Sequence, residues 1–391
     1  MQKLLLLLCS FVTVACRKPY QPKVVEKEYN YLVVEGVINT GTDSTIIKLS
    51  RTTKLDAGVK IHPESRAIIT VESDANDSYP LHEVQVGTYG AFALNLPLTK
   101  KYRLHVVTEN GEEYRSAFVD NAQTPEIDSV NFVPQKTGIQ LFVTTHDDGN
   151  KTRYYRWDYD ETWTYFSPIG SQIYYHDRKV SFRPTDSLIT ECYKRATPSN
   201  SIFIATSNKL SKDVISEYPL GYVDASTGKI SHVYSAQVKQ YAISPEAYTY
   251  WTLLKKNTEQ LGSIFDAQPS TLIGNIKCIS NPNEPVIGYI SASTIKTKRI
   301  FVTGNTLPFH VPDFVPPPDP STCVSGFISK DPEFTLIPRL ETTLANGDTL
   351  LTFYRANPAT NGILGYEYAT ADCVDCRMAG GTSVKPAYWP F

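Results

Sequence analysis

The sequence has little methionine and histidine, and it has no excess of positive charge. Its 391 residues include 2 Met and 7 His, and 38 Lys and Arg are balanced by 40 Asp and Glu. Nucleic acids are bound mainly through clustered positive charge, so this composition excludes a nucleic-acid partner. The residues that are common favour strands, with 25 Tyr and recurring Val, Ile and Thr. We therefore predict a mainly β protein that is long enough for two domains.

Motifs that are specific for catalysis are also missing. The sequence has no phosphate-binding glycine loop, no His-Glu-x-x-His pair and no serine within a Gly-x-Ser-x-Gly turn. We predict no catalytic residue, no cofactor and no metal site. A triad of Ser, His and Asp residues dispersed along the chain stays open as an alternative.

Long apolar runs are absent beyond the N-terminus. The one run there, Leu4 to Val14, is shorter than the roughly 20 residues that a membrane-spanning helix needs. A small residue, Ala15, and then Cys16 end it, which is typical of a bacterial lipoprotein signal. We predict that residues 1–15 are cleaved, that Cys16 carries lipid and that residues 16–28 form a tether. The alternative is an ordinary secretory signal, with Cys16 a normal thiol.

Residues 29–122 carry short, alternating apolar runs at regular spacing. Asn110-Gly111 is the strongest hairpin signal, because both residue types tolerate a positive φ. About seven strands in roughly 90 residues predict an immunoglobulin-like β-sandwich, which usually serves as a spacer or a binding platform. The expected strands include Tyr31–Ile38, Ser44–Leu49, Arg66–Val71, Ala91–Leu94, Tyr102–Val107 and Tyr114–Val119.

A larger β-rich domain, residues 123–391, is expected to follow a seam at Gln123-Thr124-Pro125. It carries one prominent predicted helix, over about residues 244–262. Ser244 can cap the start of this helix and Gly262 can end it. We expect the apolar stripe of the helix to pack on a sheet. The stripe consists of Tyr248, Trp251, Leu254 and Leu261.

Aromatic residues are concentrated between residues 154 and 175. From Tyr154 to Phe166 they alternate with charged residues, so one face of that strand is aromatic and the other is polar. Flat aromatic side chains suit sugars or a protein partner, and we name them as a candidate binding surface. The alternative is that alternation buries them in a core. The candidates are Tyr154, Tyr155, Trp157, Tyr159, Trp163, Tyr165, Tyr174 and Tyr175.

His146-Asp147-Asp148 places imidazole and carboxylate groups close together in the sequence. Such groups can bind Ca²⁺ or a transition metal. We favour a hairpin turn at Asp148-Gly149-Asn150, in which polar side chains satisfy local backbone groups.

The seven cysteines become five once the signal is removed and Cys16 is lipidated. In an oxidising envelope we expect disulfides with one cysteine left over, and the sequence does not give the pairing. Cys373 and Cys376 would form half of a zinc site, but no second pair with that spacing is present, so disulfides are favoured. The disulfide candidates are Cys192, Cys278, Cys323, Cys373 and Cys376.

Many short pieces of sequence occur along the chain in an order that is specific for one family. They are Tyr31–Gly36, Tyr234–Tyr241, Ser244–Tyr248, Gln268–Ser270, Gly274–Ile276, Val286–Tyr289, Asp375-Cys376, Gly380–Thr382, Lys385-Pro386 and Trp389-Pro390. In these pieces the chain resembles the domain of unknown function 4249 family of Bacteroidota lipoproteins. The resemblance covers nearly the whole mature chain. It implies an envelope lipoprotein, commonly encoded beside a TonB-dependent outer-membrane receptor, and it supplies no catalytic residues.

The signal and the resemblance together predict a function. We expect a lipoprotein anchored in the outer membrane, acting as a non-catalytic accessory or cargo-binding subunit of a TonB-dependent β-barrel receptor. This follows an analogy with surface lipoproteins that sit as lids on nutrient importers. Whether the fold faces the cell surface or the periplasm stays open. The alternatives are an envelope hydrolase acting on glycan or peptide, with His146, Asp147 or the Tyr-rich strand in its cleft, and a structural, adhesin-like spacer.

Overall fold

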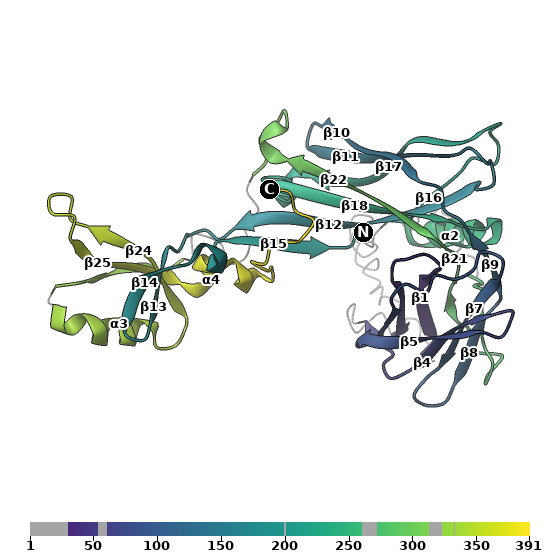
Figure 1. Ribbon diagram of the computed structural model, residues 1–391, viewed down its shortest axis with the longest axis horizontal. Helices are drawn as coiled ribbons and strands as arrows, with labels where there is room; N and C mark the ends of the chain where they lie inside the picture. Colours follow the sequence, from purple (N-terminus) through teal and green to yellow (C-terminus); the bar gives the residue numbers. More distant parts are fainter. Residues whose placement is uncertain (1–29, 54–60, 199–200, 260–271, 313–322, 332) are drawn as a thin grey trace, which may run out of the picture.

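The computed structural model describes residues 30–53, 61–198, 201–259, 272–312, 323–331 and 333–391. The predicted signal (1–15), the tether (16–28) and Cys16 lie outside these residues. The described chain is mainly β, as predicted, and Figure 1 shows it as three bodies joined in an elongated molecule. None of the helices in the described ranges is long and apolar enough to cross a membrane.

The N-terminal sheet has 12 strands and takes three of them from late in the chain. The early strands are β1 (Leu32–Asn39), β2 (Thr45–Arg51), β3 (His62–Pro63), β4 (Ile68–Ser73), β5 (Ser78–Gln85), β6 (Thr88–Ala91), β7 (Lys101–Val107), β8 (Glu113–Ser116) and β9 (Val119–Ala122). The late strands are β19 (Ile276–Cys278), β20 (Ile287–Gly288) and β21 (Ala292–Ser293). Their order is β19-β8-β7-β4-β5-β6-β2-β1-β21-β9, and a further pairing of β7 with β9 closes the path from β7 to β9 into a ring. The immunoglobulin-like arrangement of residues 29–122 stays a prediction, because three strands of this sheet come from outside that range.

The turn at Asn110-Gly111 joins β7 to β8, as the sequence predicted. Gly111 has a φ of +85° and its N–H donates to the Thr108 carbonyl over 2.9 Å. Asn110 does not have a positive φ. The turn is therefore not a primed type, and only its glycine needs the left-handed conformation.

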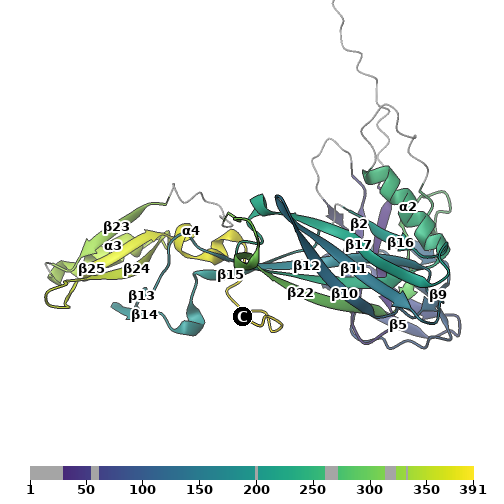
Figure 2. The same ribbon diagram turned by 90° about the horizontal axis from the view of Figure 1, so that it is seen from above.

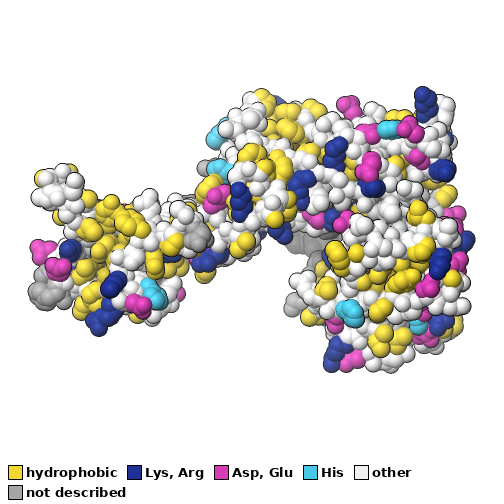
Figure 3. Space-filling view, in the orientation of Figure 1, with side chains coloured by type: hydrophobic (Ala, Val, Ile, Leu, Met, Phe, Trp, Pro, Cys, Tyr) yellow, Lys and Arg dark blue, Asp and Glu magenta, His cyan; other side chains and the backbone are white. Residues whose placement is uncertain are grey.

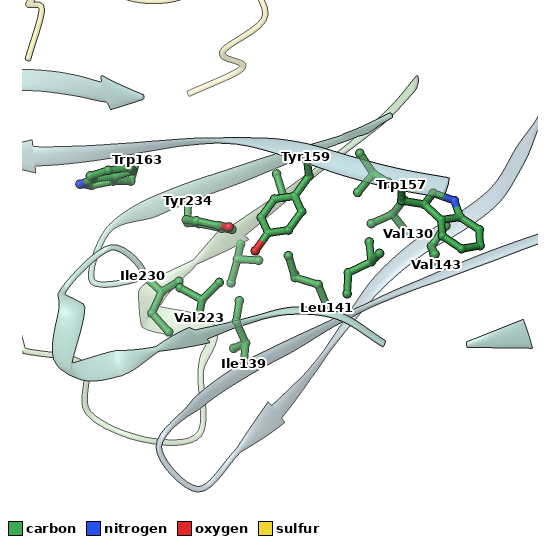
Figure 4. Packing of buried hydrophobic residues seen from close by; sticks show 14 of the residues in the cluster. Val130, Ile139, Leu141, Val143, Trp157, Tyr159, Trp163, Val223, Ile230 and Tyr234 are labelled. Carbon is green, nitrogen blue, oxygen red and sulfur yellow. The ribbon is translucent and has the colours of Figure 1, made fainter. Parts of the chain in front are cut away.

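The central unit consists of two facing sheets. The first has the order β10-β11-β17, from β10 (Ile127–Gln135), β11 (Gly138–Asp147) and β17 (Asp213–Asp224). The second has the order β15-β12-β18-β22 with β16 beside β12, from β12 (Tyr154–Phe166), β15 (Glu191–Ala196), β16 (Phe203–Thr206), β18 (Val233–Ala242) and β22 (Ile295–Thr303). Figure 4 shows the core between them, where Leu141 and Val143 of the first sheet lie opposite Trp157 and Tyr159 of the second.

A distal module extends from one end of the central unit (Figure 1, Figure 2). Its elements are the hairpin of β13 (Ile173–His176) and β14 (Lys179–Phe182), the sheet of β23 (Ser325–Ser329), β25 (Ile363–Thr370) and β24 (Thr349–Ala356), and the helix α3 (Leu336–Leu344). Ile173, Ile328, Leu340 and Leu351 form a separate buried core here. The module therefore has its own packing and is not an extension of the central core.

The predicted helix is α2 (Pro245–Glu259), and Leu261 and Gly262 lie outside the described residues. Its buried side joins the first two bodies, because one small apolar cluster contains Ala247 of α2, Val37 of β1, and Tyr241 and Ile243 at the end of β18. Tyr248 and Trp251 pack at the border of this cluster, as the apolar stripe predicted. The helix is thus packed against both units.

Candidate functional site

A cavity of about 940 Å³ lies where the N-terminal sheet meets the central unit. We call it the junction groove. Its walls are β9, the segment 123–126, the turn after β11, the start of α2, and residues 289–296. Pockets of a few hundred to about 1,000 Å³ are typical of small-molecule sites, and such sites often lie between domains.

Thr124, in the predicted seam, fixes the floor of the groove. Its N–H donates to the Thr294 hydroxyl over 2.9 Å, and its own hydroxyl donates to the Thr294 carbonyl. The same hydroxyl accepts the N–H of Ala242 over 3.0 Å. Thr124 is 1% exposed, so these bonds are shielded from water and hold the seam against β18 and the start of β22.

Gln240 of β18 makes a second buried connection. Its Nε2 donates to the Pro125 carbonyl over 2.8 Å and to the Thr145 hydroxyl over 2.9 Å. Its Oε1 accepts the indole N–H of Trp157 over 2.8 Å. The side chain is fully buried, so one glutamine connects the seam, both sheets of the central unit and the aromatic core.

Asp147 organises the turn on one wall. Its carboxylate accepts the backbone N–H groups of Gly149, Lys151 and Thr152 over 2.8 to 2.9 Å. Burial alone would raise the pKa of Asp147, but these three donors outweigh it and hold the pKa below its usual value. The Asp147 carboxylate therefore stabilises the conformation of this loop.

His146 is not part of the groove. Its Nδ1 lies 2.7 Å from Asp128 Oδ2, and this hydrogen bond raises the pKa of His146. The predicted polar turn at residues 148–150 is present, although Asp147 is the side chain that satisfies the backbone. The turn is not a hairpin, because β11 and β12 belong to different sheets. In the described ranges, no group of three or more His, Cys, Asp and Glu residues could hold a metal ion.

The first turn of α2 forms another wall. The Ser244 hydroxyl accepts the N–H of Ala247 over 3.2 Å, as expected for a helix cap. A hydrogen bond from Ser244 and the N–H of Glu246 itself lower the pKa of Glu246. The helix start is therefore already capped by its own residues, and it is a fixed wall of the groove.

The groove presents both charged and aromatic groups. Phe118, Tyr154 and Tyr289 supply aromatic surface. Lys296 is paired with Glu126, whereas Lys151 is exposed and has no ion pair with the residues that the structure describes. This combination suits a small molecule that has a polar end and an apolar end.

The predicted aromatic surface is wrong for five of its eight members, because they fill the central core. Tyr155, Trp157, Tyr159, Trp163 and Tyr165 are at most 3% exposed. The strand does have one aromatic face, as predicted, but the sheet of β10, β11 and β17 covers Trp157 and Tyr159 on it (Figure 4). The C-terminal segment at Cys376 and Gly381 encloses the Tyr165 hydroxyl. Most of the aromatic face that we predicted as a binding surface is thus buried against other parts of the chain.

The other three predicted aromatic residues lie in two places. Tyr154 lines the junction groove, where its ring centroid is 5.2 Å from that of Tyr248. Tyr174 and Tyr175 are half-buried on β13 of the distal module. Sequence reasoning missed the groove because its walls come from separate segments, although the seam at Gln123-Thr124-Pro125 marked one of them.

Four of the five disulfide candidates are paired. Cys192 bonds Cys376 and Cys323 bonds Cys373, which rules out the zinc alternative for Cys373 and Cys376. Cys278 of β19 is the one left over, and it is buried. The first disulfide ties β15 of the central unit to the chain that follows the distal sheet. The second holds the start of β23 to the short helix α4 (Ala371–Val374).

Two solved structures have some likeness to this chain. A crystal structure of a Salmonella alpha-2-macroglobulin mutant matches 86% of this chain and 16% of its own, with 9% identity and a TM-score of 0.17. The BSP domain of a biofilm-associated protein matches 72% of this chain and 62% of its own, with 8% identity and a TM-score of 0.14. This chain thus spans less than two thirds of either protein, and TM-scores this low establish no common fold. No curated protein matches the sequence.

A family model gives a match over a long part of the sequence. The model described as a domain of unknown function, DUF4249, matches residues 17–299. The matched range includes every segment that lines the junction groove. It ends before β23, so the distal sheet lies beyond it.

Proposed function

Since the chain belongs to the DUF4249 family, we propose that it is a lipid-anchored accessory subunit that captures a small-molecule cargo for a TonB-dependent outer-membrane receptor. The proposed role is binding and not catalysis. The junction groove is the observation that carries the proposal, because it is a sizeable cavity with a rigid polar floor between two β units. A preformed groove binds with a smaller loss of conformational freedom than a flexible one.

The N-terminal sequence supports the anchor. The short apolar run that ends at Cys16 has the form of a lipoprotein signal, and the proline-bearing segment after it suits an extended spacer. A lipid at Cys16 would keep the fold at the outer membrane, on either its outer or its periplasmic side.

Exposed apolar side chains on the distal module support a protein partner. Phe182 is 66% exposed, and Tyr354, which it meets edge-to-face, is 40% exposed. Ile363 and Leu364 are exposed at the tip. Figure 3 shows hydrophobic side chains gathered on this module. Apolar groups that gather on one surface often mark a protein contact, and we assign this one to the receptor.

Native mass spectrometry of the full-length protein, isolated from its own envelope in mild detergent, tests the groove. We expect a non-covalent small-molecule adduct on the wild type. The double variant Lys151→Glu/Tyr154→Ala changes two groove residues and should lose most of the adduct. The control Lys209→Glu/Tyr222→Ala makes the same changes at exposed positions outside the groove and should keep it. A wild type without an adduct, or equal loss in both variants, contradicts the proposal.

A further inference from the structure

A second cavity, of about 690 Å³, lies at the C-terminal loop of the chain and shares no residue with the junction groove. Tyr193 and Arg195 of β15 form one side of it, and residues of the loop 380–387 form the other. We call it the loop pocket. It combines a loop that is fixed at several points with cations that have no carboxylate beside them in the lining.

The start of the loop is tied to the central unit. The disulfide between Cys192 and Cys376 lies just before it. Tyr193 and Thr382 exchange backbone hydrogen bonds of 2.8 and 3.1 Å. Gly381 packs so closely on the Tyr165 hydroxyl that a side chain there would collide with it. The loop therefore cannot move away from β15 without breaking these contacts.

The end of the loop is tied to the same sheet. Trp389 is 5% exposed, and its ring meets Tyr193 and Phe301 edge-to-face at centroid distances of 5.4 and 5.3 Å. Aromatic pairs in this arrangement add stability beyond the area that they bury. With both ends anchored, the shape of the pocket is set before any ligand arrives.

The lining of the loop pocket contains two cations and no carboxylate. The Arg195 guanidinium lies 5.7 Å from the centroid of the Tyr388 ring, which restricts its orientation. Lys385 is exposed and forms no ion pair with any residue in the described ranges. Arg299 lies 3.6 Å from the centroid of the same tyrosine ring and adds a third positive charge close by. Asp160, the carboxylate near Arg299, is already paired with Lys239 at 2.7 Å.

We propose that the loop pocket binds a phosphate group through Arg195 and Lys385. A phosphate monoester carries about 1.5 to 2 negative charges at neutral pH, which matches two cations. The planar guanidinium of Arg195 can donate two parallel hydrogen bonds to phosphate oxygens, and Lys385 supplies a mobile positive charge. The phosphate belongs either to a soluble phosphate ester or to a lipid headgroup, since the recognising chemistry is the same.

Isothermal titration of the full-length protein in a non-ionic detergent tests the site. The probe is inorganic phosphate, with chloride adjusted to keep the ionic strength constant. We expect saturable binding that weakens at least tenfold in Arg195→Gln/Lys385→Gln. Lys209→Gln/Lys212→Gln removes the same charge from exposed positions elsewhere and should bind like the wild type. No saturable binding, or equal weakening in both double variants, overturns the site.

Two further probes distinguish the sources of the phosphate. Glycerol 3-phosphate represents a soluble ester, and dihexanoyl phosphatidic acid, below its micelle concentration, represents a lipid headgroup. Equal affinities for the two probes support a soluble ester, whereas tighter binding of the lipid supports a headgroup. The binding of each probe must depend on Arg195 and Lys385; if it does not, the site is refuted. The groove variant Lys151→Glu/Tyr154→Ala should keep its phosphate binding. The proposed cargo function and this site can therefore fail separately.

Discussion

At the scale of single residues, buried polar side chains hold the N-terminal sheet and the central unit together at the junction groove. Thr124 and Gln240 have no access to water, and each makes at least three hydrogen bonds with different parts of the chain. A buried polar group that loses its partner costs about 1 to 3 kcal/mol, whereas the bond itself contributes less. The junction should therefore be sensitive to changes at these two residues and tolerant of changes on its rim.

Gln240→Leu should lower the free energy of unfolding by about 3 kcal/mol, because it leaves the Trp157 indole N–H and the Pro125 carbonyl without the partner that they have in the wild type. It also removes the bond that the Thr145 hydroxyl accepts. The midpoint of urea denaturation measures this loss. Gln135→Leu makes the same change at the exposed end of β10 and should shift stability by no more than about 0.5 kcal/mol. Similar shifts in the two variants would show that the buried network does not hold the junction.

Asp147 should make stability depend on acid pH. Its pKa is lower in the fold than its ordinary value of 3.8, so its contribution is full above that value and is lost as the pH falls through the lower, folded pKa. Between about pH 4 and pH 2 the urea midpoint of the wild type should therefore fall more steeply than that of Asp147→Asn. Asp148→Asn changes a side chain that is 98% exposed and should keep the wild-type slope. Parallel slopes in wild type and Asp147→Asn would refute this role.

At the scale of elements, α2 connects the first two bodies, since its buried side contacts both. Its cap at Ser244 is also a wall of the groove. Fraying of the first helical turn should therefore loosen both the packing between the bodies and the shape of the groove.

Ser244→Ala should cost about 1 kcal/mol of stability, because the Ala247 N–H loses its acceptor. Chemical denaturation followed by circular dichroism measures this cost. Hydrogen exchange should locate the faster-exchanging amides in the first turn of α2. Thr252→Ala, on the exposed side of the same helix, should leave stability within about 0.5 kcal/mol of the wild type. An equal cost at both positions would mean that the cap has no special role.

Elements with a strong local pattern could be predicted from the sequence. β7, β11 and β12 show clear alternation over most of their length, and the start of α2 has its cap and its stripe. The hairpin β13–β14 has no comparable local signal. Its turn residues, Asp177 and Arg178, have φ values of +51° and +62°. A primed turn without glycine or asparagine gives almost no signal in the sequence.

Elements that depend on distant partners could not be predicted in the same way. β20 and β21 have two residues each, too few to show any period, and they exist because β1 pairs with them. The aromatic face of β12 was predicted, but the sequence does not say which sheet covers it. The junction groove was missed for the same reason, since long-range contacts alone bring its walls together.

The whole molecule has three bodies with separate cores. The N-terminal sheet and the central unit meet at the groove. The distal module extends away from the central unit (Figure 2), and it carries exposed apolar side chains. This arrangement suits a protein that holds a cargo in its body and contacts a partner with its distal module. A lipid at Cys16 would add the attachment to the membrane.

The most direct test of the central claim is a pull-down of the tagged full-length protein from its native membranes in mild detergent, with mass spectrometry of the bound proteins. We predict a TonB-dependent β-barrel receptor in about equal amount. The variant Ile363→Asp/Leu364→Asp, changed at the apolar tip of the distal module, should lose this receptor. Val84→Asp/Val86→Asp changes two equally apolar, exposed residues on the N-terminal sheet and should retain it. Recovery of the wild-type protein without any receptor from intact envelopes would contradict the claim.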